Sequence, residues 1–368
     1  MSLAAELRFF ARTQVLFEGR PLVFFGGTDY HRLASHPEVV RALQEAAQSE
    51  GLSCAGSRLT TGNHPLLARL EARTAEFLGR GSVTACSGGY LANTVAVEAV
   101  RDDYWRFFLD AGAHPSLASA AECLPRDRVH PFRGFEPEDL ARELRLNLRP
   151  GEKPLLLTDG VVGGSGQLPP LLAYWQLVRE QGGALLVDDS HGLGVVGPGG
   201  LGSPALAGLP PGACIQTGTY AKAFGAFGGL VAGAAGLAGK VAARSRAFVG
   251  ATPIPPPLAA AALRAIGLLQ EHPEWITGLQ ARMARVRERI TALGFPAVDS
   301  PAPIVSVTHG DVRRNRRLRT ILLKAGIYPS FINYPGCPPG GHFRFAFSSV
   351  HTEAEVDALL RAIASSCP

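Results

Sequence analysis

The stretch GALLVDDSHG, residues 183–192, is an unbroken aliphatic run that stops at two aspartates and a histidine. A strand without polar alternation is buried on both faces, as in a parallel sheet that is covered by helices. Ligands of such sheets bind at the carboxyl ends of the strands. The stretch therefore predicts a central strand with Asp188, Asp189 and His191 at a ligand-binding edge.

Similar short runs recur between residues 80 and 235 and alternate with segments of helical pattern. This alternation is typical of an α/β fold, and we expect a mainly parallel, seven-stranded sheet covered by helices. The predicted strands are 82–88, 105–114, 128–133, 154–160, 183–192, 213–219 and 228–234, with helices at 89–101, 116–123, 136–146 and 170–182.

The sequence on either side of residues 80–235 suggests that the chain is divided into three regions. An N-terminal segment (1–35) precedes the large α/β domain (36–255), which also contains helices predicted at 37–50 and 66–79. Residues 256–368 are expected to form a long connecting helix and a smaller C-terminal α+β domain, because prolines stand just before an alanine-rich run.

Within this last region we expect the long helix to break near His272–Pro273 and to continue towards Gly294. Two strands are predicted at 303–309 and 342–348. A final helix is expected to begin at Thr352, where TEAE matches the capping-box pattern.

Composition excludes several classes of protein. The chain has 368 residues, 46% of them hydrophobic and 18% charged, which suffices for a substantial core. Its net charge is +5, but acidic and basic residues are mixed along the chain, so no nucleic-acid surface is predicted. The densest basic run, DVRRNRRLR (311–319), has the spacing of a solvated helix face.

Cysteine usage points to a reducing compartment. The six cysteines are scattered without a C-x-x-C pair, so neither a metal site nor a redox motif is predicted. No apolar run reaches the roughly 18 residues that a membrane span needs, and no leader pattern opens the sequence. We expect a cytoplasmic protein without a membrane span.

Lys222 stands out because the chain uses arginine almost everywhere else: only four of its 36 basic residues are lysines. It lies in TGTYAKAFGAFGG (217–229), among glycine, alanine and phenylalanine. Apolar surroundings disfavour the charged ammonium and make a neutral, nucleophilic amine available. An ordinary surface lysine is the alternative interpretation.

Three features near strand ends fit the needs of pyridoxal 5′-phosphate (PLP). Asp188 supplies a carboxylate for the pyridine nitrogen, and Lys222 supplies an amine for the aldehyde. The Gly88-Gly89-Tyr90 turn opens a helix whose amides suit a phosphate, and Thr219 adds a hydroxyl. A nucleotide enzyme is the competing hypothesis, but neither the P-loop pattern nor the full G-x-G-x-x-G pattern is present.

Together these motifs resemble the α-oxoamine synthases, fold-type I PLP enzymes that include 8-amino-7-oxononanoate synthase and serine palmitoyltransferase. The resemblance covers almost the whole chain. It rests on VDDSHGLGVVG (187–197) with TGTYAKAFGAFGG (217–229), and on GSRLTTGNHPLLARLE, SGGYLANT, HPSLASAA, ATPIPPP and FRFAFSSVHTEAEVDAL in the family's order.

The resemblance assigns roles to individual residues. It implies Lys222 as the Schiff-base lysine, Asp188 as partner of the pyridine nitrogen, His191 near the phenolic oxygen and His114 stacked on the ring. The residues implied to contact the phosphate are Gly88, Gly89, Tyr90, Thr219 and, from a neighbouring subunit, Thr252, so a homodimer with shared active sites is expected.

Arg344 matches the arginine that grips the amino acid carboxylate, a bidentate task that arginine suits. The chain departs from the family pattern at TDYHRLA (28–34), where Thr28 replaces an asparagine or similar group near the substrate. It departs again where Gly163 takes the place of a serine that donates to the phenolic oxygen, although Ser165 lies two residues further on.

The resemblance implies a PLP-dependent acyltransferase that condenses a small amino acid with an acyl-CoA or acyl-carrier thioester to an α-aminoketone, usually with decarboxylation. Two alternatives remain open. One is another PLP enzyme on the same scaffold, such as an aminotransferase, aldolase or lyase, and the departures at Thr28 and Gly163 favour it. The other is a non-catalytic partner subunit, although such a protein would be expected to lose Lys222.

Overall fold

A computed structural model describes residues 6–296, 298–333, 338 and 340–367. The chain forms two compact units, described separately here. The larger comprises Leu33–Val162 and Leu168–Ile276, and the smaller comprises Met1–Arg32, Gly163–Gln167 and Thr277–Pro368. The N-terminal segment thus belongs to the smaller unit, and the helix that begins at Pro256 belongs to the larger one.

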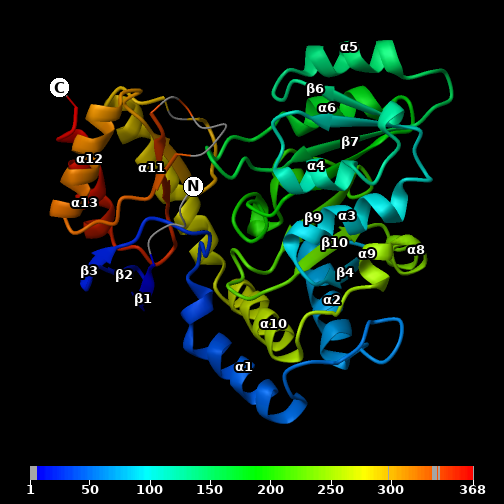
Figure 1. Ribbon diagram of the computed structural model, residues 1–368, viewed down its shortest axis with the longest axis horizontal. Helices are drawn as coiled ribbons and strands as arrows, with labels where there is room; N and C mark the ends of the chain where they lie inside the picture. The colour runs from blue at the N-terminus through cyan, green and yellow to red at the C-terminus, as the bar shows by residue number, and fades with distance from the viewer. Residues whose placement is uncertain (1–5, 297, 334–337, 339, 368) are drawn as a thin grey trace. The chain divides into compact units, whose positions relative to one another are not determined.

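The larger unit is built on a seven-stranded sheet in the order β4-β10-β9-β8-β7-β5-β6 (Figure 1). The strands β5 to β9 are parallel, and β10 is antiparallel to both of its neighbours, β4 and β9. The prediction of a mainly parallel sheet is therefore confirmed. The strands are β4 (Ser82–Cys86), β5 (Arg106–Asp110), β6 (Val129–Phe132), β7 (Pro154–Asp159), β8 (Ala184–Asp188), β9 (Cys214–Thr219) and β10 (Gly229–Gly233).

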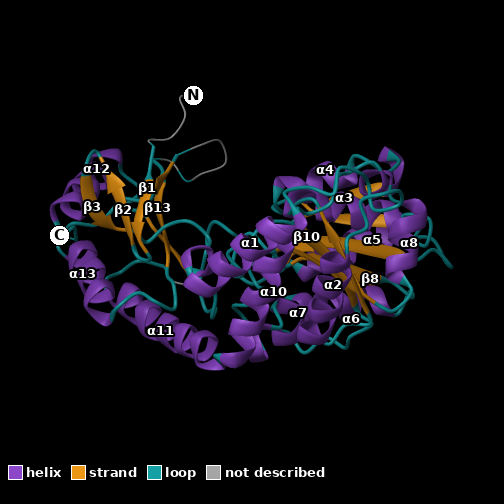
Figure 2. Ribbon diagram, turned by 90° about the horizontal axis from the view of Figure 1, so that it is seen from below, coloured by secondary structure: helices purple, strands orange, loops and turns teal. Residues whose placement is uncertain are grey.

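Helices cover both faces of this sheet, which explains the aliphatic strands. Leu155 and Leu157 of β7 pack in one core cluster, while Leu156 between them packs in another on the opposite face. Figure 2 shows α3 and α4 on one side of the strands and α6 on the other. The helices of this unit are α1 (Pro37–Glu50), α2 (Pro65–Leu78), α3 (Gly89–Val100), α4 (Pro115–Ala121), α5 (Pro137–Asn147), α6 (Leu171–Arg179), α7 (Ser203–Leu206), α8 (Leu237–Arg244), α9 (Arg246–Val249) and α10 (Pro256–Glu271).

The smaller unit contains two antiparallel three-stranded sheets. One consists of β1 (Arg8–Ala11), β2 (Gln14–Phe17) and β3 (Arg20–Val23), and the other has the order β11-β13-β12. The N-terminal sheet was not predicted, because its four-residue strands carry little alternation. The remaining elements are α11 (Pro273–Ala292), β11 (Ile304–Val307), α12 (Val312–Lys324), β12 (Phe331–Ile332), β13 (His342–Ala346) and α13 (Glu353–Ala364).

Two features of helix ends that the sequence predicts, a break near His272 and a capping box at Thr352, are present in the structure. The break between α10 and α11 falls at His272, because Pro273 cannot supply the backbone N–H that would continue the first helix. At α13 the capping box is complete: the Thr352 hydroxyl accepts from Glu355 N, and the Glu355 carboxylate accepts from Thr352 N. None of the helices described here is long and apolar enough to cross a membrane.

Candidate active site

Three neighbouring parallel strands of the larger unit end in buried aspartates. Asp110 closes β5, Asp159 closes β7 and Asp188 closes β8, and Asp159 lies beside Asp188 in the strand register. The carboxyl ends of parallel strands meet at one edge of a sheet. The sequence therefore brings three acidic groups together, and their surroundings decide which of them carries a charge.

Asp188 is held by a closed hydrogen-bond network. Its Oδ2 accepts from Asn93 Nδ2 at 2.6 Å and lies 3.3 Å from the Ser116 hydroxyl, while its Oδ1 accepts from Ser190 N at 3.1 Å. Asn93 Oδ1 in turn accepts from the Thr217 hydroxyl at 2.5 Å. These hydrogen bonds fix the orientation of the Asp188 carboxylate.

Asp159 differs from Asp188 although the two are adjacent. Burial and then the negative charge of Asp188 raise the pKa of Asp159 to about 8. Its two oxygens accept from the backbone N–H of His114 at 3.0 and 3.2 Å. Near neutral pH Asp159 is therefore mostly protonated, and it positions His114 without adding a second full charge beside Asp188.

His114 lies between these carboxylates and the Gly-rich turn. It caps α4, because its Nδ1 accepts from Ser116 N at 3.2 Å, so the capping role that is common for such a histidine is present here. Its ring is exposed and makes an edge contact with Tyr90, with ring centroids 6.3 Å apart. Burial lowers the pKa of His114, the charge of Asp188 acts against this shift, and the charge of Lys222 adds to it. His114 is thus close enough to interact electrostatically with Asp188 and with Lys222.

The Gly88-Gly89-Tyr90 turn forms the N-terminus of α3. A Cβ at Gly88 would meet no atom within 4 Å, whereas a Cβ at Gly89 would lie 2.6 Å from Thr219 Cβ. No side chain in the described part of the chain caps this helix. The turn therefore presents backbone N–H groups next to open space, which suits an anion such as a phosphate.

Thr219 and Lys222 lie where β9 turns towards β10. The Thr219 hydroxyl donates to Gly228 O at 2.7 Å and accepts from Ala221 N at 3.0 Å, so its proton stabilises this turn. Close packing explains the small residues around half-buried Lys222: a Cβ at Gly225 would lie 2.2 Å from Ala34 N. Gly225 also has φ +59°, a conformation that favours glycine.

Two further residues that the sequence predicts for the site, His191 and Thr252, also belong to the larger unit. His191 is half-buried, three residues after Asp188. Thr252 is exposed, and its carbonyl oxygen accepts from the Ser87 hydroxyl at 2.6 Å, next to the Gly-rich turn of the same chain. Its role toward a second subunit stays a prediction.

Arg344 belongs to the smaller unit, on β13. Its Nε donates to Gly163 O at 2.6 Å and its Nη1 donates to Gly27 O at 3.1 Å, so it joins the segments at which the chain departs from its family pattern. Thr28 is half-buried beside Gly27. The Ser165 hydroxyl is hydrogen-bonded to Gln167, and its role in place of the missing serine stays a prediction.

Sequence reasoning missed Asn93, Ser116 and Asp159. Asn93 and Ser116 belong to motifs that were recognised, and Asp159 ends a predicted strand. Their positions at strand or helix ends were the available signal. Which of them faces Asp188 depends on how α3 and α4 pack on the sheet.

Known proteins match this chain along most of its length. The family model described as "Aminotransferase class I and II" matches residues 21–363. The 8-amino-7-oxononanoate synthase of Methylobacterium radiotolerans is 35% identical over 349 residues, covering 94% of this chain and 88% of that protein. The enzyme of the same name from Marinobacter nauticus is 36% identical over 352 residues, covering 95% and 88%.

A solved structure agrees with the fold. A serine palmitoyltransferase variant from S. paucimobilis, determined with PLP and myriocin bound, superposes with a TM-score of 0.89 at 24% identity and covers 98% of this chain and 90% of that one. The sequence relatives and the family model together assign the family. The chain belongs to the class I and II aminotransferases and, among them, to the PLP-dependent acyltransferases known as α-oxoamine synthases.

Proposed function

We propose that this protein condenses a small amino acid with an acyl thioester to give an α-aminoketone, with loss of the carboxylate as CO₂ and release of the thiol, in the manner of its 8-amino-7-oxononanoate synthase relatives. The observation that carries the proposal is the buried, fully hydrogen-bonded Asp188 close to Lys222 and the uncapped N-terminus of α3. These are the three kinds of group that a PLP site requires.

The residues present fit PLP. Asp188 would hold the pyridine nitrogen, Lys222 the aldehyde carbon, and the α3 turn the phosphate. The space at Gly88 supports this assignment, since a side chain there would fill the anion cradle. When bound, PLP supplies an electron sink for the electron pair that is left on the α-carbon of the amino acid.

The protein's own groups then bind, orient and move protons. Asn93 and Ser116 fix the Asp188 carboxylate, which would face the ring nitrogen. The Lys222 amine removes the α-proton and later returns a proton to the same carbon. His114 would lie against the ring and His191 near its phenolic oxygen, and the hydrogen bonds from the His114 backbone to Asp159 fix His114.

The substrate carboxylate is assigned to Arg344, whose guanidinium suits a bidentate contact. Thr28 is proposed to lie near the substrate. Thr252 of a second copy of the chain would complete the phosphate site, so we propose a homodimer. A cytoplasmic location fits the five free cysteines, Cys54, Cys86, Cys123, Cys214 and Cys367, whereas Cys337 lies outside the described residues.

The test is release of free thiol from acyl-CoA esters by the PLP-loaded protein with glycine, alanine or serine, compared with Lys222→Ala. Removal of the lysine is expected to reduce turnover by roughly 10³-fold or more, since it removes both the cofactor link and the base. Lys324→Ala, at an exposed position of α12, is the matched control.

Three outcomes are informative. Amino acid-dependent thiol release that requires Lys222 supports the acyltransferase. Amino acid turnover without any thioester would instead identify an aminotransferase, aldolase or lyase. A protein that neither takes up PLP nor shows a Lys222-dependent absorption band would contradict the proposal and favour a non-catalytic subunit.

A further inference from the structure

The larger unit has a cavity at the edge of the sheet opposite the candidate active site. Its volume is about 270 Å³, and it is lined by Ala184 and Cys214, the first residues of β8 and β9, together with residues from the loops that precede the strands. Asp188 lies four residues further along β8, roughly 13 Å away at the usual rise per residue. The cavity is therefore separate from the candidate active site.

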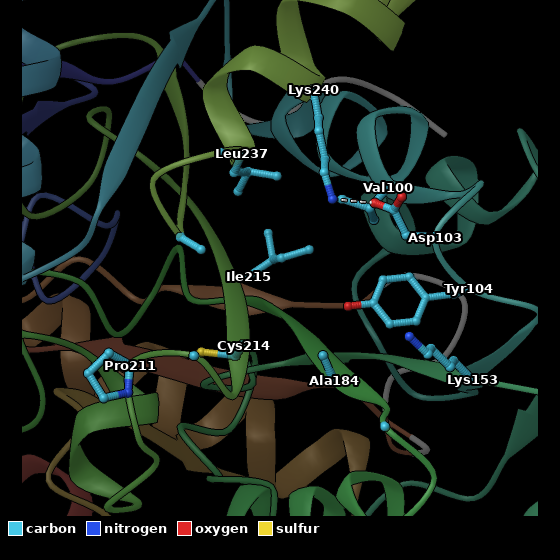
Figure 3. Close-up of a pocket in the computed structure, with 14 residues that line it drawn as sticks. Val100, Asp103, Tyr104, Lys153, Ala184, Pro211, Cys214, Ile215, Leu237 and Lys240 are labelled. Atoms are coloured by element: carbon cyan, nitrogen blue, oxygen red, sulfur yellow. Dashed lines mark hydrogen bonds and ion pairs between the residues drawn. The ribbon is translucent and has the colours of Figure 1, made fainter.

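One side of this cavity is apolar. Val100, Ile215 and Leu237 line it together with buried Cys214 (Figure 3). The Cys214 sulfur lies 3.3 Å from Arg80 Nη2. Burial raises the pKa of the Cys214 thiol, so the sulfur behaves as part of the apolar wall. This surface suits a short hydrocarbon body.

The other side is polar and rich in hydrogen-bond donors. The Tyr104 hydroxyl points towards the middle of the cavity in Figure 3, and no hydrogen bond links it to the residues that the structure describes. Burial, reinforced by the charge of Asp103, raises the pKa of Tyr104. The phenol therefore stays neutral and keeps a proton to donate.

Two lysines stand on the same rim, half of the four in the whole chain. The carbon stem of exposed Lys153 passes Gly182, where a Cβ would lie 3.6 Å from Lys153 Cε, and the side chain lines the cavity. Within the described ranges Lys153 has no ion-pair partner. Lys240 pairs with Asp103 at 2.8 Å, and the same carboxylate also pairs with Arg244 at 3.0 Å. Asp103 thus pairs with two cations, and Lys153 adds a further positive charge to the rim, so cations outnumber the acidic group.

From this arrangement we propose that the cavity binds a small amphipathic carboxylate. The carboxylate accepts hydrogen bonds from the Tyr104 hydroxyl and the Lys153 ammonium, and the apolar body lies against Ile215 and Leu237. The volume equals that of about nine water molecules at about 30 Å³ each, which limits the ligand to a short chain or one ring.

Hexanoate is the probe, titrated calorimetrically into the PLP-loaded protein. Acetate has the same head group without the apolar body, and 1-hexanol has the body without the charge. Hexanoate is expected to bind more tightly than either compound. Tyr104→Phe and Lys153→Gln should each weaken it about tenfold or more, as the loss of one hydrogen bond to a charged group does.

Lys324→Gln removes the same charge from an exposed helix end of the other unit and should leave the dissociation constant unchanged. Lys222→Ala should also leave the dissociation constant of hexanoate unchanged, because the residues at the carboxyl edge of the sheet do not contact the ligand. Equal binding of hexanoate by wild type, Tyr104→Phe and Lys153→Gln would overturn the proposal, and so would loss of binding in Lys222→Ala. The measurement needs no turnover, so its outcome is independent of the proposed reaction.

Discussion

The two edges of the central sheet each contain an aspartate, and the two aspartates differ in burial and in hydrogen-bond partners. At the carboxyl edge Asp188 is buried and receives hydrogen bonds from Asn93 and Ser190, whereas at the amino edge Asp103 is partly exposed and shared between Lys240 and Arg244. A buried charge depends on a few fixed partners, and an exposed one is also stabilised by water. Equivalent substitutions at the two edges should therefore differ strongly in effect.

The largest difference is expected between Asp188→Asn and Asp103→Asn. Both remove one negative charge with little change in shape, but only Asp188 is proposed to face the cofactor's ring nitrogen. Turnover should fall roughly 10²- to 10³-fold in Asp188→Asn, because a charge placed for the reaction is lost, and should change less than about twofold in Asp103→Asn. Steady-state kinetics with saturating PLP measure both. Equal losses in the two variants would contradict the assignment of Asp188.

The next test concerns the partners of the buried carboxylate. Asn93→Ala leaves Asp188 Oδ2 and the Thr217 hydroxyl each without one hydrogen bond. We expect a loss of about 1–3 kcal/mol in the free energy of unfolding, together with a lower kcat. Urea unfolding and kinetics provide the values. Asn147→Ala, whose amide bonds Glu143 at the end of α5, is the control and should lose less than about 0.5 kcal/mol. A loss in Asn93→Ala no larger than this would argue against a positioning role.

A pH series distinguishes Asp159 from an exposed aspartate. Its pKa is raised from 3.8 to about 8, so between these values the native state holds a proton that the unfolded chain has released. Stability contributed by the protonated group is lost as pH rises, by up to about 1.4 kcal/mol per pH unit. Asp159→Asn should flatten this decline between about pH 4 and pH 8, measured by urea unfolding. The exposed Asp102 gives the matched control, and an unchanged slope in Asp159→Asn would rule out the raised pKa.

The smallest effect is expected at the amino edge. Lys240→Gln removes the ion pair with Asp103, in which the lysine side chain is 42% exposed. The free energy of unfolding should fall by less than about 1 kcal/mol, and the difference from wild type should shrink in 1 M salt. A salt-independent loss of several kcal/mol would show that this edge is as tightly coupled as the other.

The fold could be predicted because each strand carries its own signal. All seven predicted strands of the large sheet are present, since residues such as Leu155, Leu156 and Leu157 must be apolar wherever helices cover both faces. The short strands β1 to β3 lacked that signal and were missed. The hydrogen bond from the Thr219 hydroxyl to Gly228 O could not be predicted from the sequence either, and its role toward a phosphate stays a prediction.

The sequence by itself determined the parallel α/β architecture, the chemical family and the identity of Lys222 and Asp188 as unusual residues. Hydrophobic runs, motif spacing and the scarcity of lysine are all properties of the chain in one dimension. Only the tertiary structure decided that Asn93 and Ser116 secure Asp188, that Asp159 shares its edge, and that Tyr104, Lys153 and Lys240 meet around one cavity. Those relations join residues up to 136 positions apart, because Tyr104 precedes Lys240 by that distance in the chain, and they arise only when strands align and helices pack across them.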